Sequence, residues 1–299
     1  MGDTAPTIGF VGLGRMGGAM AQRLLAAGYP VSGTARTREH LDPLLAEGLR
    51  WRDTPRAVAE ASDIVVTSLP DDDVLEAVAS EEDGILASFG RDAIWVEMST
   101  VSPRASREIA ARVRERGAQM LDAPVSGSVP QAQNGTLTIM VGGDEGAYAR
   151  VEPILRDLGT PTHVGENGQG LVLKLAINIS LGVQMLALSE GLVLAERSGI
   201  DRNLALEIMT ESAIGSPMLK ARAASIFDLP EEAWFDLDFM HKDIELALAA
   251  AAELHIPLPT AADTDEILTV AHKLGYGSRD LAALFQVLER MTDERAQAA

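Results

Sequence analysis

The stretch TIGFVGLGRMGGAMAQRLLAAG, residues 7–28, contains a short apolar run, a glycine turn and an amphipathic run, in that order. Residues 8–11 are typical of a buried strand, and residues 15–27 have the apolar spacing of a helix. Gly28 stands where a helix commonly ends, because glycine adopts the left-handed backbone conformation without strain. We therefore expect a strand, a tight turn and a helix, which open a β-α-β unit.

The glycine turn has the spacing G-x-G-x-x-G, with Gly12, Gly14 and Gly17. By itself this spacing is weak evidence for a dinucleotide site, but it becomes meaningful when it follows a strand and opens a helix, as it does here. Gly12 permits the tight turn, Gly14 lets the backbone approach a pyrophosphate, and Gly17 lets the helix pack closely on the strand. The first turn of the helix then offers N–H groups to the phosphates. The pattern predicts a dinucleotide site; the alternative is a glycine turn that binds nothing.

Strand-like and helical runs alternate through the rest of the first half. The strand-like runs are PVSGTA (30–35), DIVVTSLP (63–70), AIWVEMST (93–100), MLDAPVS (120–126) and TLTIMVGG (136–143). Helical patterns include residues 38–48, where Pro43 is expected to interrupt the helix, and residues 102–117, with Ser102 as N-cap. This alternation predicts a mostly parallel sheet with helices on both faces.

The pattern changes near Gly165, and almost no strand signal follows it. Helices are expected at about 169–198, 201–212, 216–226, 239–253, 260–274 and 278–291. We therefore predict an α/β protein of two domains. An N-terminal Rossmann-type doubly wound sheet spans 1–165, and an all-α C-terminal domain spans 166–299.

Composition narrows the possible functions. The chain has 299 residues and 46% apolar residues, enough for two cores of ordinary size. Its net charge of -19 argues against binding to nucleic acid or to an anionic membrane. The sequence contains no cysteine, which excludes disulfides and fits the cytoplasmic location that we expect. The five histidines show no metal-ligand spacing, so no metal site is predicted.

The residue at the end of the second strand normally determines whether the site prefers NAD or NADP. An acidic residue there binds the ribose hydroxyls of NAD and repels a 2′-phosphate. This sequence reads GTARTREH (33–40), with no acid at the strand end; Thr34, Arg36, Thr37 and Arg38 can contact a phosphate instead. NADP(H) is therefore favoured and NAD(H) is possible, unless the two arginines are merely solvated.

Two further segments carry candidate chemistry. Ser126, Gly127 and Ser128 of DAPVSGS can offer donors to a carboxylate, or form an ordinary turn. The most apolar segment, 171–195, contains Lys174 and Asn178 on one helical face and is interpreted as a core helix. A partly buried lysine with a lowered pKa can protonate an alkoxide, with the asparagine orienting it. The alternative is a lysine that snorkels to solvent.

Taken together, these segments resemble the β-hydroxyacid dehydrogenase family, which includes 3-hydroxyisobutyrate dehydrogenase, tartronate semialdehyde reductase and the plant-type glyoxylate/succinic semialdehyde reductases. The resemblance covers nearly the whole chain. It rests on GFVGLGRMGGAMAQRLLAAG (9–28), EMSTVSP (97–103), DAPVSGS (122–128), GTLTIMVGG (135–143), GQGLVLKLAIN (168–178) and FDLDFMHKDIELAL (235–248).

The resemblance implies roles for individual residues. Lys174 corresponds to the catalytic lysine, Asn178 to its neighbour, and residues 126–128 to a carboxylate-binding loop. Phe235 corresponds to a pocket aromatic and Asp243 to a further substrate-site residue. The predicted cofactor-binding residues are Gly12, Leu13, Gly14, Arg15, Met16, Gly17, Thr34, Arg36, Thr37, Leu69, Pro70, Thr100 and Lys242.

By the same resemblance we expect hydride transfer between NADP(H) and a small carboxylate substrate, in a homodimer or homotetramer joined through the helical domain. Ser128 and ARTR (35–38) are similar to the glyoxylate/succinic semialdehyde branch, whereas GTLTIMVGG is similar to the other branches, so the substrate stays open. An imine reductase on the same fold is the alternative, although such enzymes usually carry Asp or Tyr in place of Lys174. A non-catalytic binding module is a third reading.

Overall fold

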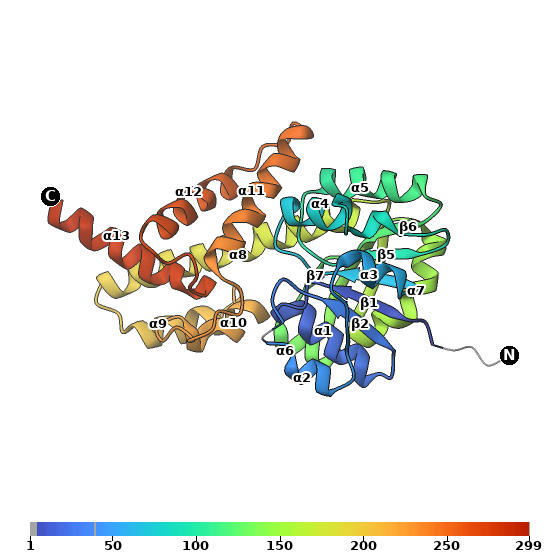
Figure 1. Cartoon of the computed structure of the whole chain (residues 1–299). Helices are drawn as coiled ribbons and strands as arrows, with labels where there is room; N and C mark the ends of the chain where they lie inside the picture. The colour runs from blue at the N-terminus through green and yellow to red at the C-terminus, as the bar shows by residue number, and fades with distance from the viewer. Residues whose placement is uncertain (1–4, 39, 299) are drawn as a thin grey trace. The chain divides into compact units, whose positions relative to one another are not determined.

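The computed structural model describes residues 5–38 and 40–298 (Figure 1). Its tertiary contacts divide the chain into two units, residues 1–174 and 175–299. The division falls inside the helix that carries Lys174, a few residues after that helix begins. The first unit contains all the strands of the described residues, and the second is helical.

The first unit is built on one sheet with the order β3-β2-β1-β4-β5-β6-β8-β7, and β9 pairs with β8. Neighbouring strands from β3 to β6 are parallel, whereas β8 runs antiparallel to β6 and β7. The mostly parallel sheet is therefore confirmed. The strands are β1 (Ile8–Val11), β2 (Val31–Thr34), β3 (Arg50–Trp51), β4 (Ile64–Thr67), β5 (Ile94–Glu97), β6 (Gln119–Asp122), β7 (Val125–Ser126), β8 (Leu137–Gly142) and β9 (Gly159–Gly165).

Helices cover both faces of this sheet, as expected. Neighbouring residues on one strand, such as Trp95 and Val96 of β5, enter different apolar cores, because side chains along a strand alternate between faces. Figure 1 shows α1, α2 and α6 on one side and α4 and α5 on the other. The helices are α1 (Arg15–Ala26), α2 (Asp42–Ala46), α3 (Pro55–Glu60), α4 (Asp72–Ser80), α5 (Pro103–Glu115), α6 (Val129–Asn134) and α7 (Glu145–Leu158), with a 3₁₀ turn at Ile85–Ala87.

Local sequence explains where these helices begin. The side chains of Thr54, Asp71, Ser102 and Asp144 each accept a hydrogen bond from the N–H three residues on, at the starts of α3, α4, α5 and α7. The predicted N-cap at Ser102 is confirmed. Pro43 does not interrupt α2; it lies in the first turn, where its missing N–H is not needed.

The carboxyl edge of the parallel strands carries one row of residues in register. Thr34 pairs with Val11, Val11 with Thr67, Thr67 with Glu97, and Glu97 with Asp122. All five are buried and four are polar. This edge is where open parallel sheets bind their ligands.

The second unit continues α8 (Gln169–Arg197) into a helical assembly around one core. Met185 of α8, Ile244 of α11, Leu268 of α12 and Phe285 of α13 are among its fully buried side chains. The all-α second region is confirmed. The remaining helices are α9 (Arg202–Glu211), α10 (Pro217–Arg222), α11 (Leu237–Glu253), α12 (Pro259–Lys273) and α13 (Leu284–Ala298), with 3₁₀ turns at Ala223–Ser225 and Leu281–Ala283.

Helix α8 is long and apolar enough to cross a membrane by length and composition, a test that core helices of soluble proteins also pass. Met185, Leu188 and Leu192 from this helix are buried in the core of the second unit. Ser189 is also buried and donates its hydroxyl to the Met185 carbonyl at 2.8 Å. These contacts agree with the interpretation as a core helix.

Candidate active site

The glycine turn joins β1 to α1, and packing explains two of its three glycines. Gly12 has a φ of +92°, and a Cβ there would lie 2.3 Å from the Ser68 carbonyl oxygen. A Cβ at Gly17 would lie 2.0 Å from the Gly12 oxygen. A Cβ on Gly14, by contrast, would meet nothing within 4 Å, and this residue begins α1 without a side-chain cap. Gly14 therefore leaves an open backbone approach, as a pyrophosphate requires.

The residues at the end of β2 are those predicted to contact the 2′-phosphate of NADP. Thr34 is buried, and its carbonyl accepts the Gly12 N–H at 3.0 Å. Arg36 and Thr37 follow it and are exposed. The Arg38 guanidinium lies 5.6 Å from the centre of the Trp51 ring. Two cations thus follow the strand where an NAD-selective site would have an acid.

The segments after β4 and β5 bring Leu69, Pro70 and Thr100 to the same edge of the sheet. The Leu69 N–H donates to the Ser99 hydroxyl at 2.6 Å. The Gly12 turn packs against Ser68. The predicted cofactor-binding residues of the first unit therefore follow four neighbouring parallel strands, β2, β1, β4 and β5.

The loop at residues 126–128 has a specific local structure. Gly127 has a φ of +135°, and a Cβ there would lie 2.8 Å from the Leu137 side chain, so glycine is required. Ser128 caps α6 in a capping box with Gln131, and its N–H donates to Gln131 Oε1 at 2.9 Å. That N–H is therefore engaged within the protein. A carboxylate would be held here through hydroxyl groups, with the half-buried Ser126 beside it.

Asp122 has a role that we did not predict from the sequence. Its carboxylate accepts the N–H of Gly168 at 2.7 Å and that of Leu171 at 3.0 Å, at the start of α8. Burial raises the pKa of Asp122, and these two backbone hydrogen bonds oppose the rise. Glycine is needed at 170, because a Cβ there would lie 2.8 Å from the carboxylate. Asp122 therefore anchors the helix that carries Lys174.

Helix α8 carries Lys174 in a half-buried position and Asn178, one turn on, in a buried one. Asn178 donates from Nδ2 to Asp243 Oδ2 at 2.5 Å. Lys242 Nζ lies 2.8 Å from the other oxygen, Asp243 Oδ1. Three predicted site residues, from two segments that are distant in sequence, thus meet in the second unit.

The amide oxygen of Asn178 is buried without a hydrogen-bond partner among the described residues. A buried amide oxygen ordinarily accepts a hydrogen bond, so it is suited to a donor from a ligand.

Phe235, the predicted pocket aromatic, lies close to a second aromatic residue, Phe239. Phe235 is half-buried against the core of the second unit, and its ring stacks with that of Phe239 at 6.5 Å between centres. Leu219 is buried in the same core, and Met218 is partly buried against it.

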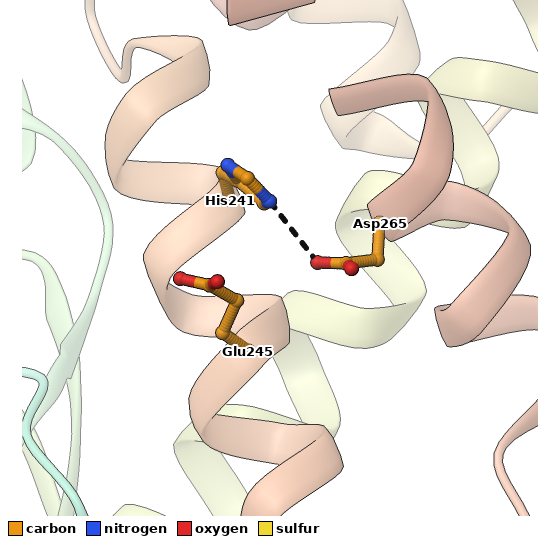
Figure 2. Close-up of side chains that lie close together, drawn as sticks. All are labelled: His241, Glu245 and Asp265. Carbon is orange, nitrogen blue, oxygen red and sulfur yellow. Dashed lines mark ion pairs between the residues drawn. The ribbon is translucent and has the colours of Figure 1, made fainter. Parts of the chain in front are cut away.

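Three potential metal ligands come together outside these clusters. His241 and Glu245 lie one turn apart on α11, and Asp265 comes from α12, with one ligand atom from each within 4.8 Å of the others. Figure 2 shows the His241 ring directed toward Asp265; its Nε2 lies 3.2 Å from Oδ1. The contact between His241 and Asp265 needs no metal, and Glu245 is exposed. The expectation of no metal stays a prediction.

Comparison with known proteins gives the family. The model described as the NAD binding domain of 6-phosphogluconate dehydrogenase matches residues 7–168. The model described as NAD-binding of NADP-dependent 3-hydroxyisobutyrate dehydrogenase matches residues 168–288. The 2-(hydroxymethyl)glutarate dehydrogenase of Eubacterium barkeri is 36% identical, over 95% of this chain and 95% of its own length. The 2-hydroxy-3-oxopropionate reductase of Escherichia coli is 35% identical, over 96% and 99%.

Solved structures agree with these sequence matches. The structure of 3-hydroxyisobutyrate dehydrogenase from Salmonella typhimurium has a TM-score of 0.85 and 30% identity, covering 94% of this chain and 99% of that one. An imine reductase from Myxococcus stipitatus has a TM-score of 0.65 and 22% identity over 95% and 100%, which shows a shared fold alone. The chain therefore belongs to the β-hydroxyacid dehydrogenase family of NAD(P)-dependent oxidoreductases.

Proposed function

We propose that the chain is an NADP(H)-dependent reductase that interconverts a small β-hydroxy acid and its semialdehyde or keto acid, with Lys174 as general acid and base. The observation that carries this proposal is the placement of Lys174 on α8. The lysine is half-buried, its helix is anchored by Asp122, and it precedes by one turn the buried Asn178 that binds Asp243.

Proton transfer is the chemical task of the lysine. When bound, the reduced nicotinamide supplies a hydride to the carbonyl carbon of the substrate. The carbonyl oxygen then holds a negative charge, and the Lys174 ammonium donates a proton to it, giving the hydroxy acid and a neutral amine. In the reverse direction the neutral amine accepts that proton as the hydride leaves. Ser126 and Ser128 hydroxyls would hold the substrate carboxylate.

The residues present fit a dinucleotide. The open backbone at Gly14 and the uncapped start of α1 suit a pyrophosphate. Preference for NADP(H) is supported by the exposed Arg36 and by the absence of an acidic residue at positions 35–38. Replacing Arg36 with Ala should weaken the binding of NADPH far more than the binding of NADH. Equal weakening of both nucleotides would contradict the contact with the 2′-phosphate.

The deciding experiment is a screen of the purified protein with NADPH and NADH. Glyoxylate, succinic semialdehyde, methylmalonate semialdehyde and tartronate semialdehyde cover the carbonyl substrates suggested by the resemblance, and β-hydroxy acids test the reverse direction. Oxidation of NADPH with at least one carbonyl acid is expected. A protein that reduces none of them contradicts the proposal.

A lysine variant then tests the mechanism. Lys174→Ala should remove most turnover and leave nucleotide affinity nearly unchanged, because the proton is needed at the transition state. Lys220→Ala is the matched control, since Lys220 pairs with Glu211 on the surface. Loss of nucleotide affinity equal to the loss of turnover would show that Lys174 anchors the cofactor instead.

The same assays address the imine reductase alternative. By resemblance, Lys174 argues against it, because those enzymes usually carry Asp or Tyr at that position. Turnover of a cyclic imine without any carbonyl activity would reverse the preference. Binding of NADPH without turnover of either class would favour the non-catalytic module.

We also propose a homodimer or homotetramer that forms through the helical unit. Support comes from large apolar side chains exposed on that unit, including Leu194, Leu204 and Ile208. Light scattering of the purified protein tests this, and a monomer at micromolar concentration would contradict it. The proposed cytoplasmic location rests on the sequence expectation and is tested by cell fractionation.

A further inference from the structure

A buried glutamate, Glu97, lies at the end of β5 and is not among the predicted site residues. Glu97 is fully buried, and no cation contacts it in the hydrogen bonds and ion pairs of the described residues. A carboxylate in that position needs donors, because burial without them is very unfavourable. The donors that it has define a connected network.

Both carboxylate oxygens of Glu97 accept hydrogen bonds. Oε2 accepts the Thr67 hydroxyl at 2.6 Å, and Oε1 accepts the Ser99 N–H. Trp95 Nε1 donates to the Thr67 hydroxyl at 2.8 Å, so the single proton of that hydroxyl remains for Glu97. In both hydrogen bonds the Glu97 carboxylate is therefore the acceptor.

The network reaches the loops predicted to hold the cofactor. The Ser99 hydroxyl accepts the Leu69 N–H, and the Ser102 N–H donates to Asp72 at 2.8 Å, a second link between the same two loops. Ser68, between Thr67 and Leu69, is the residue against which the Gly12 turn packs. Glu97 thus joins the segments after β4 and β5, and through Ser68 it supports the glycine turn.

We propose that Glu97 is a positioning residue for the nicotinamide cofactor, because its carboxylate holds residues 68–70 and 98–100 in the arrangement that binds it. This inference rests on the proposed function for the role of those loops. Glu97 itself contacts neither cofactor nor substrate. It acts through Thr67 and Ser99.

The test compares Glu97→Gln with Asp63→Asn. Glutamine keeps the shape of Glu97, but its amide group donates on one side where the carboxylate accepts on both. Asp63 lies just before β4 at the opposite edge of the sheet and accepts hydrogen bonds from the Thr7 N–H and hydroxyl at 2.8 and 2.7 Å. Asp63→Asn is therefore the same chemical change on the same sheet, away from the cofactor loops.

Nucleotide dissociation constants are measured by nicotinamide fluorescence at a temperature where circular dichroism shows every variant folded. Glu97→Gln should raise the dissociation constants of NADPH and NADH by the same factor, about tenfold. That factor matches the loss of one hydrogen bond to a charged group. Asp63→Asn should change neither by more than about twofold. Glu97→Asp, which keeps the charge, should restore part of the affinity. At saturating nucleotide, the KM for the carbonyl substrate should stay unchanged.

Two results would overturn the inference. One is unchanged nucleotide affinity in Glu97→Gln, and the other is equal weakening in Asp63→Asn, which would indicate a general loss of stability. If Glu97→Gln does not fold, Thr67→Val carries the same test, because it removes one of the two donors. A wild-type protein that binds neither nucleotide refutes the proposed function itself, and the wild-type measurement alone reveals that case.

Discussion

Replacing Glu97 with Gln should change how stability depends on pH. Burial raises the pKa of Glu97 from 4.5 to about 7, and the nearby charge of Asp122 adds to the rise, while hydrogen bonds from Ser99 and Thr67 oppose it. The folded protein therefore holds this proton more tightly than the unfolded chain does. The resulting stabilisation is fully present below about pH 4.5 and is lost as the pH rises through about 7.

The size of the effect follows from the two pKa values. The rise from 4.5 to about 7, at about 1.4 kcal/mol for each pKa unit, corresponds to about 3 kcal/mol. Glutamine cannot ionise, so it lacks this dependence. The free energy of unfolding of the wild type, relative to Glu97→Gln, should therefore fall by about 3 kcal/mol between acidic and mildly alkaline pH.

Urea unfolding of both proteins from about pH 4.5 to about pH 9 measures this difference. Trp95 donates into the Glu97 network and is fully buried, so tryptophan fluorescence reports on the first unit when Trp234 of the second unit is replaced by Phe in both proteins. Asp63→Asn is the control, because hydrogen bonds from Thr7 lower the pKa of Asp63 from 3.8, so its stabilisation is lost only as the pH falls below that value. The difference between the wild type and Asp63→Asn should therefore stay nearly constant over the measured range. A wild-type-to-Gln difference that stays constant with pH, or that grows as the pH rises, would refute the reasoning.

Three further substitutions test the rest of the site. Asp122→Asn should lower the free energy of unfolding by about 2 kcal/mol in urea titrations, because one amide oxygen replaces two acceptors of backbone N–H groups; an unchanged midpoint would contradict the anchoring role. Gly17→Ala should destabilise by about 2 kcal/mol or more through its clash with the Gly12 carbonyl. Gly14→Ala should keep the free energy of unfolding within about 0.5 kcal/mol of the wild-type value. It should nevertheless raise the dissociation constant of NADPH at least about tenfold, as measured by fluorescence titration. Tight NADPH binding by Gly14→Ala would place the pyrophosphate elsewhere.

The sequence was sufficient for the elements that have strong local signals. The strand, turn and helix of residues 8–26 follow from periodicity and glycine spacing, and the helices of the second unit follow from their apolar pattern. Residues 216–226 were expected to form one helix but divide into α10 and a 3₁₀ turn. The last helix begins at Leu284, after a separate 3₁₀ turn that Asp280 caps.

Elements stabilised by distant partners were harder to predict. β9 has the sequence GTPTHVG, with a proline and two glycines, and no local pattern marks it as a strand. It forms because it pairs with β8 along its length. The meeting of Asn178 and Asp243, 65 positions apart, could be expected only from the resemblance to a family.

The two acids that were missed had a signal in the sequence. Thr67, Glu97 and Asp122 are each the last residue of a buried strand, and parallel pairing places them side by side. A polar residue that ends each of three neighbouring parallel strands indicates a polar row at the ligand-binding edge. Periodicity does not show this, because the pattern runs across the strands.

That row also explains why two carboxylates are buried next to each other. Burial raises the pKa of both, so their ionised forms do not favour folding. Each carboxylate, however, accepts hydrogen bonds from backbone N–H groups outside the sheet: Glu97 from Ser99 after β5, and Asp122 from Gly168 and Leu171 at the start of α8. The same register therefore fixes the segment after β5 and the start of the helix of Lys174 relative to one sheet edge. An apolar pair at these two positions would favour folding, but it would leave both segments without their anchor.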